Sequence, residues 1–334
     1  MTSEHHQAAA PAIPVHILSG FLGSGKTTLL MRVLEQYRAE GVRAAVIMNE
    51  LGEVNLDGQL VGAQVPMQEL LGGCICCSIR GDLGLALTRL VESEQPDVIV
   101  IESTGAANPL EIIDGVTETA MVARIELQSV TVVVDGPGLL ELRRRGGASL
   151  RLMREQVRCA TGLLVNKADR LDPERLVEVQ QLVREWNPLA ALVVTEHCQV
   201  EPGLFLRRGP VAPPRAAEPS AAEPPAGQAP IHPTHDHVMA HTHYFRAPVD
   251  SEAFEALLAG LPERVFRAKG IVTFRDTPSR FLFQYAFRES DFMRIDPQGE
   301  VHDVAVFIGE HFSREALIEQ LEALERIAAA EGKS

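Results

Sequence analysis

Residues 20–27, which read GFLGSGKT, have the types and spacing of a phosphate-binding loop. They fit the pattern G-x-x-x-x-G-K-[ST] and lie between an apolar stretch at 14–19 and a segment with helical periodicity. Glycine tolerates the turns that aim backbone N–H groups at an anion at a helix N-terminus. An ordinary glycine-rich turn is the alternative, but strand, loop and helix follow in the order that phosphate binding requires. The residues expected to hold the phosphates are Gly23, Ser24, Gly25, Lys26, Thr27 and Thr28.

Within this loop, Lys26 would reach the β- and γ-phosphates and the Thr27 hydroxyl would bind Mg²⁺. A carboxylate for the same end of the nucleotide is offered by DVIVIESTG at 97–105, where Glu102 follows four apolar residues. Glu102 suits a strand end near Mg²⁺ or the attacking water, although it could also be a polar residue that only ends a strand. We therefore take Lys26 and Glu102 as catalytic candidates, and Thr27 and Glu102 as Mg²⁺ ligands.

A second motif, NKAD at 166–169, follows another apolar run. Ligands commonly meet a parallel sheet at the carboxyl ends of its strands. There the Asp169 carboxylate can accept hydrogen bonds from both the ring N–H and the exocyclic amine of guanine, a pair that adenine does not offer. A tetrapeptide of this kind also occurs by chance. Downstream of a phosphate loop, however, Asn166, Lys167 and Asp169 favour GTP over ATP.

Three of the five cysteines, Cys74, Cys76 and Cys77, lie within four positions. Deprotonated thiols are soft ligands for Zn²⁺ or Co²⁺. A closed structural zinc site needs four ligands and this cluster supplies at most three, so the pattern predicts an open site from which metal can be handed on. Glu53 is a plausible further ligand. Redox pairing of Cys74 with Cys77 and simple packing remain alternatives.

Five of the eleven histidines lie within twelve residues, at positions 232, 235, 237, 241 and 243. Neutral imidazoles on a flexible segment bind Zn²⁺, Co²⁺ or Ni²⁺ weakly and could collect metal for the thiol site. A polar linker of biased composition explains them equally well. The accessory ligands under the first hypothesis are His232, His235, His237, His241 and His243. The isolated Cys159 and Cys198 are expected to be buried as small apolar residues.

The elements that must position these residues divide the chain into domains. Short β-rich runs alternate with helical segments from residue 13 to about 200, which predicts a P-loop NTPase-type α/β fold with a mostly parallel sheet flanked by helices. Residues 207–237 contain eight of the 21 prolines and almost no large apolar side chain, so they read as a linker. Strand and helix patterns after it predict a small α+β C-terminal domain. The expected boundaries are a tail at 1–12, a nucleotide-binding domain at 13–206, a linker at 207–240 and the C-terminal domain at 241–330.

Composition narrows the class of function and of partner. The net charge of −14 argues against a general nucleic-acid binder, because phosphate contact needs a basic surface. The basic stretch at 141–158 is expected to be the solvated face of a helical segment. The N-terminal residues have no basic leader and no apolar run reaches a spanning length, so we expect a cytoplasmic protein without membrane contact. In that compartment clustered thiols favour a metal or redox site over a disulfide framework.

Taken together, the motifs resemble those of the CobW family of P-loop GTPases, which includes cobalamin-synthesis proteins, nitrile-hydratase activators and zinc chaperones. The resemblance rests on GFLGSGKTTLL, NELGEV, GGCICCSIRGDL, IESTGAANP, VVVDG, NKAD, RAKGIV and VFIG. It implies that Gly23, Gly25, Lys26 and Thr27 hold Mg-GTP, that Asn166 and Asp169 hold guanine, and that Cys74, Cys76 and Cys77 hold a transferred metal. The family more often has Phe where Leu51 stands and Ala where Gly136 stands; neither difference removes a ligand.

The expected function is that of a GTPase acting as a metallochaperone. GTP binding would help to assemble the metal site, and hydrolysis would release Zn²⁺, or Co²⁺, to a client metalloprotein. The alternative is a metal-buffering or sensing protein with incidental GTPase activity, in which metal affinity does not depend on the nucleotide. A P-loop kinase for a small molecule is disfavoured by the guanine motif. A homodimer is possible.

Overall fold

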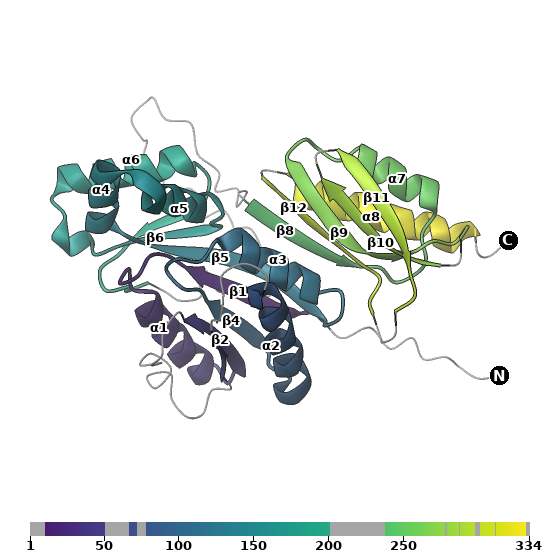
Figure 1. Cartoon of the computed structure of the whole chain (residues 1–334), viewed down its shortest axis with the longest axis horizontal. Coiled ribbons are helices and arrows are strands. Elements are labelled where there is room, and N and C mark those ends of the chain that lie inside the picture. The colour runs from purple at the N-terminus through teal and green to yellow at the C-terminus, as the bar shows by residue number, and fades with distance from the viewer. Residues whose placement is uncertain are drawn as a thin grey trace, which may run out of the picture.

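The computed structural model describes residues 11–50, 67–71, 78–200, 238–277, 279–286, 288–297, 301–310 and 312–331. The first domain is built on a seven-stranded sheet with the strand order β3-β2-β4-β1-β5-β6-β7, in which every neighbouring pair is parallel (Figure 1). This confirms the predicted fold class. Its strands are β1 (Ile13–Ser19), β2 (Ala44–Glu50), β3 (Met67–Leu71), β4 (Val98–Glu102), β5 (Ile125–Asp135), β6 (Gly162–Asn166) and β7 (Ala191–Val194).

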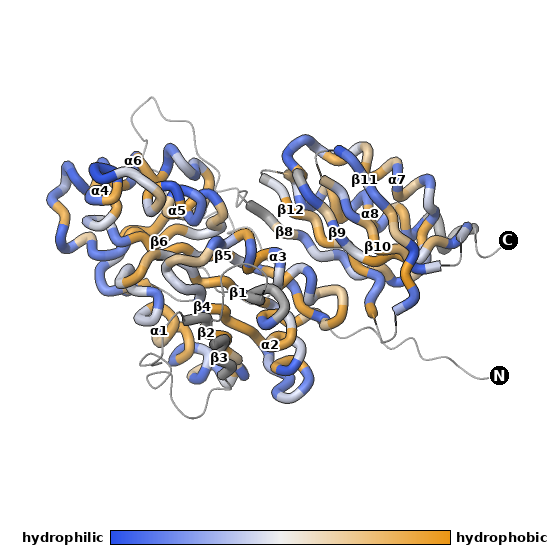
Figure 2. Tube along the Cα trace, in the orientation of Figure 1, coloured by the Kyte–Doolittle hydropathy of each residue, from blue (hydrophilic) through white to orange (hydrophobic). Residues whose placement is uncertain are grey.

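Helices cover both faces of this sheet and close two apolar cores. The helix α1 packs on one face, while α2, α3, α5 and α6 supply buried residues to the core on the other face. Strands β4 and β6 are buried along their whole length, as expected of parallel strands covered on both sides. Hydrophobic residues predominate in the central part of the sheet (Figure 2). The helices are α1 (Lys26–Ala39), α2 (Ser78–Glu94), α3 (Pro109–Thr119), α4 (Gly136–Arg145), α5 (Gly147–Arg158), the 3₁₀ turn η1 (Ala168–Arg170) and α6 (Pro173–Trp186).

Local sequence sets the start of several helices. Asn108, Asp135 and Asp172 each precede a helix that has one proline at its first or second position. Each of these side chains accepts a hydrogen bond from a backbone N–H in the first turn. This arrangement satisfies a donor that the helix itself leaves unpaired, and proline costs nothing there because its missing N–H would have had no partner. Helix α4 begins immediately after β5, whereas short segments that carry candidate site residues separate β4 from α3 and β6 from α6.

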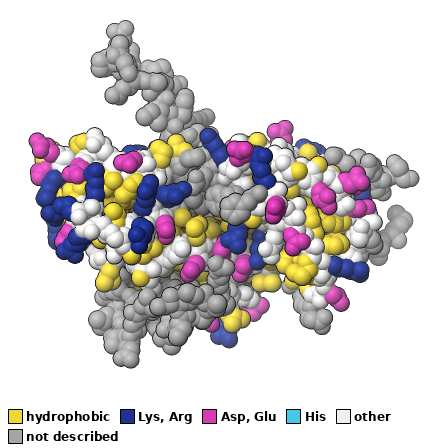
Figure 3. Space-filling view, turned by 45° about the horizontal axis from the view of Figure 1, so that its top comes forward, with side chains coloured by type: hydrophobic (Ala, Val, Ile, Leu, Met, Phe, Trp, Pro, Cys, Tyr) yellow, Lys and Arg dark blue, Asp and Glu magenta, His cyan; other side chains and the backbone are white. Residues whose placement is uncertain are grey.

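The basic stretch at 141–158 forms parts of α4 and α5, and its arginines are exposed, as predicted. Lys and Arg side chains gather over this end of the molecule (Figure 3). Cys159 and Cys198 are 4% and 0% exposed, which confirms that they are buried. No described helix is long and apolar enough to cross a bilayer.

The second domain contains a five-stranded antiparallel sheet with the order β11-β10-β9-β12-β8. Two helices cover one face, where Phe254 packs edge-on against Phe283 and contacts Phe274 and Phe292. Its elements are β8 (Val238–Tyr244), α7 (Ser251–Ala259), β9 (Val265–Thr273), β10 (Arg280–Ala286), β11 (Glu289–Ile295), β12 (Val304–Glu310) and α8 (Arg314–Glu331). Residues 238–240, which we placed in the linker, belong to strand β8; positions 207–237 lie outside the described residues.

Two strands that the sequence patterns did not predict are present. Strand β3, MQELL, is the edge of the first sheet, and β11, ESDFMRI, is the edge of the second. Most side chains of β11 are exposed, so the strand lacks the apolar alternation that identifies a half-buried strand. Edge strands of this kind are held by backbone pairing with one neighbour, which leaves no signal in hydropathy.

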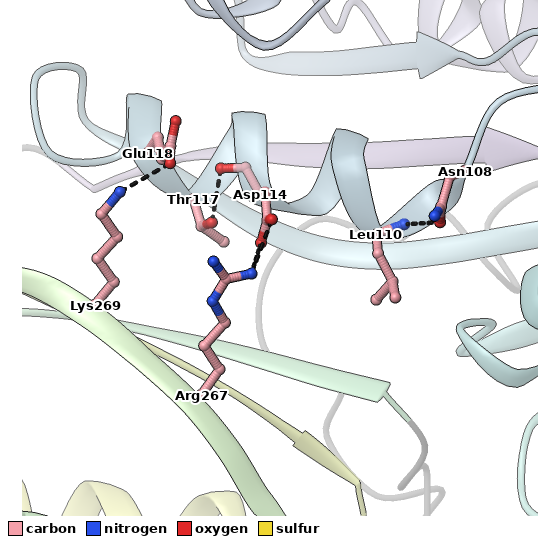
Figure 4. A network of polar contacts seen from close by, with 7 residues as sticks. All are labelled: Asn108, Leu110, Asp114, Thr117, Glu118, Arg267 and Lys269. Atoms are coloured by element: carbon pink, nitrogen blue, oxygen red, sulfur yellow. Dashed lines mark hydrogen bonds and ion pairs between the residues drawn. The ribbon is translucent and has the colours of Figure 1, made fainter. Parts of the chain in front are cut away.

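The two domains meet at helix α3 and the start of β5. Asp114 and Glu118 lie one helical turn apart on α3, and Arg267 and Lys269 lie two residues apart on β9. Four helical residues rise about 6 Å and two strand residues about 6.7 Å, so both pairs can form together. The Arg267 Nη1 donates to both Asp114 carboxylate oxygens at 2.9 Å, and the Lys269 Nζ donates to Glu118 at 2.8 Å (Figure 4).

A tyrosine fixes the far end of the same contact. The Tyr244 hydroxyl accepts the Ile125 N–H at 3.0 Å and lies within hydrogen-bonding distance of the carbonyl oxygens of Ala120, Ala123 and Ile125. Burial raises the pKa of this phenol, so it stays protonated and donates to one of those carbonyls. Arg314 of α8 also pairs with Glu126 of β5. The C-terminal domain thus contacts the helix that follows β4 and the strand that leads toward the nucleotide site.

Candidate nucleotide and metal site

The phosphate loop connects β1 to α1, and two of its glycines are required by their surroundings. Gly20 has a φ of +136°, and a Cβ there would lie 2.2 Å from the Val133 carbonyl oxygen. Gly25 has a φ of +113°, and a Cβ there would lie 2.5 Å from the Asn166 amide nitrogen. Only glycine combines these dihedral angles with so close an approach of neighbouring atoms. The loop predicted from the sequence is therefore present at the N-terminus of α1.

Lys26 and Thr27 lie at the first turn of α1, next to the end of β4. The Lys26 ammonium donates to the Phe21 carbonyl at 3.2 Å, across its own loop. The Thr27 hydroxyl donates to Glu102 Oε1 at 2.9 Å, and Glu102 is 6% exposed. The structure thus brings together Thr27 and Glu102, which are 75 residues apart in the chain. A hydroxyl and a carboxylate side by side are hard oxygen ligands of the kind that Mg²⁺ prefers, so these residues fit that ion.

On the other side of the loop, Asn166 links three segments. Its amide donates to the Ser24 carbonyl at 2.8 Å, and its Oδ1 accepts the Cys198 N–H at 3.0 Å. The Cys198 thiol in turn donates to the Gly25 carbonyl at 3.3 Å. Burial raises the pKa of this thiol to about 11, so it remains a protonated donor at neutral pH. Asn166 is 3% exposed and holds the phosphate loop against the segment that follows β7.

The rest of the NKAD motif faces outward. Lys167 has a φ of +62° and its ammonium pairs with Asp135, the last residue of β5. This left-handed residue turns the chain into η1, and the Asp169 side chain is exposed there. Thr28 is likewise exposed one position beyond Thr27. The geometry leaves the Asp169 carboxylate open for the donors of a base.

The sequence did not indicate two contributors to this site. One is the segment around Cys198, where both His197 and Cys198 have positive φ values. Its position after β7, at the carboxyl end of the last parallel strand, is the signal that would have found it. The other is Gln156 of α5, whose amide donates to the carbonyls of Gly105 and Ala107. A glutamine on the apolar side of an otherwise arginine-rich helix was the sign of this contact.

The predicted metal ligands fall into two groups. Cys74, Cys76, Cys77, Glu53, His232, His235 and His237 lie outside the described residues. His241 and His243 lie in β8 and point toward α8, where His241 Nδ1 accepts from Arg314 Nε at 3.2 Å and His243 Nε2 is 3.5 Å from Glu325. Burial and the Arg314 charge lower the pKa of His241 to about 3. Within the described part of the chain, no three His, Cys, Asp or Glu residues form a metal cluster.

Comparisons with known proteins agree with this architecture. Residues 14–194 match the family model described as CobW/HypB/UreG, nucleotide-binding domain, and residues 238–325 match the cobalamin synthesis protein CobW C-terminal domain. The chain is 31% identical over 319 residues to a protein named zinc chaperone YjiA from Escherichia coli K12, covering 91% of this chain and 96% of that one. It is 34% identical over 218 residues to zinc-regulated GTPase metalloprotein activator 1 of Dictyostelium discoideum, covering 54% and 45% of the two chains.

Other relatives match over shorter parts. The zinc chaperone YeiR of Escherichia coli K12 is 32% identical over 187 residues, with 56% of each chain covered. The chain spans about half the length of the YeiR and Dictyostelium relatives that it matches. Among solved structures, a Zn(II)-bound YjiA GTPase from Escherichia coli aligns with 24% identity and a TM-score of 0.44, over 94% of this chain and 99% of that one.

Proposed function

Because the chain belongs to the CobW/HypB/UreG family and carries the CobW-type C-terminal domain, we propose that it is a GTP-dependent zinc chaperone. It binds Mg-GTP at the phosphate loop and Zn²⁺ at Cys74, Cys76 and Cys77, with Glu53 as a further ligand. Hydrolysis of GTP is coupled to release of the metal to a client metalloprotein. Zn²⁺ is favoured over Co²⁺ because the relatives that match over most of their length are named zinc chaperones.

The observation that carries the nucleotide half of this proposal is the bond between Thr27 and Glu102. It places a hydroxyl and a buried carboxylate together beside Lys26, at the end of the loop where the β- and γ-phosphates of a nucleotide bind. When bound, Mg²⁺ would supply charge neutralisation at those phosphates. Lys26 would exchange its contact with the Phe21 carbonyl for the phosphate oxygens. Glu102 would orient the attacking water or the ion, and Asn166 would keep the loop in place.

Guanine selection rests on Asp169. Its carboxylate is exposed and acceptor-only when ionised, so it can take the two N–H donors of guanine. Lys167, held by Asp135, and Asn166, held by Ser24 and Cys198, fix the turn from which Asp169 projects. This arrangement supports GTP as the substrate.

The position of the cysteine motif in the chain supports the proposed coupling of metal binding to the nucleotide state. The cysteine motif lies between the phosphate loop and Glu102, an interval in which GTPase segments order around the γ-phosphate. If GTP raises the affinity for Zn²⁺, then Zn²⁺ must raise the affinity for GTP by the same factor.

The test is a competitive titration of Zn²⁺ and Co²⁺ against a chromophoric chelator, with Mg²⁺ and either a non-hydrolysable GTP analogue or GDP. We expect tighter Zn²⁺ binding with the analogue, and loss of this difference in Cys76→Ser and Cys77→Ser. Cys159→Ala, which removes a buried thiol far from the motif in sequence, is the matched control. Equal affinity in both nucleotide states would instead identify a metal buffer on a GTPase fold.

The histidines enter the proposal as an accessory metal-collecting segment. Deletion of 230–237 removes His232, His235 and His237 and stops before β8, so the C-terminal sheet keeps its edge strand. We expect the metal stoichiometry measured by equilibrium dialysis to fall. The variants His241→Gln and His243→Gln test whether the two histidines of β8 contribute to metal binding. An unchanged metal stoichiometry in the deletion and both substitutions would contradict the collecting role.

A further inference from the structure

Gln156 is a fully buried polar residue on a helix whose outer side is arginine-rich. It is 0% exposed, and its amide nitrogen donates to the Gly105 carbonyl at 3.2 Å and the Ala107 carbonyl at 3.3 Å. Burying a carboxamide is unfavourable unless it is hydrogen-bonded, and an apolar residue would fill this place at lower cost. Only the amide nitrogen is paired, because the Gln156 Oε1 has no hydrogen-bond partner among the described residues. The cost of burying Gln156 is thus only partly offset, which points to a role in the segment that it contacts.

That segment, residues 103–108, leads from Glu102 to helix α3 along the phosphate loop. The Ser103 N–H donates to the Leu18 carbonyl at 2.9 Å, so the segment starts beside the end of β1. A Cβ on Gly105 would lie 2.4 Å from the Leu22 backbone nitrogen. Residues 103–107 thus lie against the loop that cradles phosphate, immediately after the carboxylate bonded to Thr27.

Beyond the bond of Ser103 to Leu18, the other backbone N–H bonds of residues 104–107 among the described residues are local. The Ala107 N–H donates to the Thr104 carbonyl and the Ala106 N–H to the Thr104 hydroxyl, both within a four-residue turn. Gln156 reaches the turn from another helix. By holding the carbonyl oxygens of Gly105 and Ala107 on the α5 side, it fixes two peptide planes, because each peptide group is rigid.

Helix α5 is itself a fixed support for this contact. The Asn187 amide donates to the Val157 and Ala160 carbonyls at 2.6 and 3.0 Å, and its Oδ1 accepts the Ala190 N–H. Met153 and Val157, which flank Gln156 on the helix, are 1% and 0% exposed in the core. Gln156 therefore projects from a packed helix toward a turn that, within the described part of the chain, is otherwise bonded to other elements only through Ser103.

We propose that Gln156 is a positioning residue for GTP hydrolysis, which sets the orientation of residues 103–107 beside the γ-phosphate. The inference rests on the proposed function, since it requires GTP in the phosphate loop. The turn lies on the side of the phosphate loop that faces Glu102, whereas Asn166 and Asp169 lie on the side where the base would bind. GDP has no γ-phosphate, so its affinity does not depend on this orientation. Gln156 thus separates the recognition of GTP from the recognition of GDP.

The test compares Gln156→Leu, which removes the donors, with Gln156→Glu, which keeps the shape but places a carboxylate against two carbonyl oxygens. Gln181→Glu, at an exposed position on α6, is the control for the charge change. Single-turnover GTP hydrolysis and the affinities for fluorescent GDP and a non-hydrolysable GTP analogue are measured on the full chain. We expect hydrolysis to fall about a hundredfold in Gln156→Leu, the loss typical of a displaced reacting group, with GDP affinity unchanged.

The pH profile of Gln156→Glu distinguishes positioning from general damage. A protonated carboxyl group can donate one hydrogen bond to Gly105 or Ala107, and a carboxylate can donate none. Burial and the facing carbonyls favour the protonated form. Its hydrolysis rate relative to wild type should therefore recover as the pH is lowered from about 8 to about 6.

Two results would overturn the inference while leaving the proposed function intact: wild-type hydrolysis rates in both variants, or GDP and GTP-analogue affinities that fall together. Loss of folding in Gln156→Leu, seen by circular dichroism, would shift the decision to Gln156→Glu, where a flat pH profile relative to wild type counts against positioning. A wild-type protein that neither binds nor hydrolyses GTP would refute the proposed function itself, and this inference with it.

Discussion

Replacement of Asn166 by alanine should weaken binding of GTP and GDP equally. The Asn166 side chain joins the phosphate loop, through the Ser24 carbonyl at 2.8 Å, to the segment after β7, through the Cys198 N–H at 3.0 Å. Alanine removes both bonds at a position that is 3% exposed, so water does not readily replace them. Neither bond lies on the side of the phosphate loop that faces Glu102, so the loss of both bonds should weaken GTP and GDP binding alike.

The magnitude follows from what the two bonds contribute. At about 1 kcal/mol net each, they stabilise the loop arrangement by about 2 kcal/mol. Both bonds exist without a nucleotide, so their loss lowers affinity only to the extent that the loops relax in the unliganded protein and must be reordered on binding. Complete relaxation sets the ceiling, and about 2 kcal/mol corresponds to about a thirtyfold rise in Kd.

The assay is a fluorescence titration of GDP and of a non-hydrolysable GTP analogue, with thermal unfolding measured alongside. Asp169→Ala is the comparison. Because Asp169 is exposed, this replacement should lower the preference for guanine over adenine nucleotides without lowering the Tm. An Asn166→Ala protein that binds GDP within about twofold of wild type would show that the loops stay ordered without the amide, and would refute the reasoning.

Three further outcomes are expected. Gly25→Ala should abolish nucleotide binding, because its Cβ would lie 2.5 Å from the Asn166 amide nitrogen. Gly23→Ala, with open space around its Cβ, should cost only the left-handed backbone strain of about 1–2 kcal/mol. GDP titrations measure both effects, and an equal loss of GDP affinity in the two variants would contradict this reasoning. Arg267→Ala should speed amide hydrogen exchange in α3 about tenfold, since it removes the cation paired with the Asp114 carboxylate, which is 11% exposed. Arg288→Ala, at an exposed ion pair, should have no effect on α3. Unchanged exchange in both variants would show that the Arg267–Asp114 pair does not stabilise α3. Burial lowers the pKa of His16 from 6.5 to about 4, so between these pH values the unfolded chain binds a proton that the folded chain does not. The free energy of unfolding should therefore fall as the pH falls through this window, by at most about 1.4 kcal/mol per pH unit. Urea titrations of His16→Gln should show a shallower pH dependence than those of His197→Gln, the control at an exposed site.

The parts of the fold that carry strong local signals could be predicted from the sequence. The phosphate loop, the parallel strands that follow it and the burial of Cys159 and Cys198 follow from glycine spacing and apolar runs. The edge strands β3 and β11 could not, because edge pairing requires only backbone groups on one side. The residues that assemble the site across the chain were harder still. Thr27 and Glu102 were predicted to lie near the same Mg²⁺, and the structure brings the two side chains together. The place of Gln156 on the apolar side of its helix indicates that it is buried, but not that its partner is Gly105.

The histidines illustrate why residue type alone decides little. His241 and His243 were grouped with three linker histidines by spacing, yet in β8 they face Arg314 and Glu325 on α8. A strand places residues two apart on the same face, so their partners depend on which helix packs there. The predicted cysteine ligands lie outside the described residues and stay a prediction.

The domain contact at α3 has a consequence for chimeric proteins built from relatives of this chain. The Tyr244 hydroxyl bonds to main-chain atoms, which any sequence supplies, so a transplanted C-terminal domain that keeps this tyrosine would find its place. The pairs of Arg267 with Asp114 and of Lys269 with Glu118 depend on side chains contributed by both domains. The pair of Arg314 with Glu126 is a third such contact. Domains of different origin are therefore compatible only if these charged pairs are exchanged together.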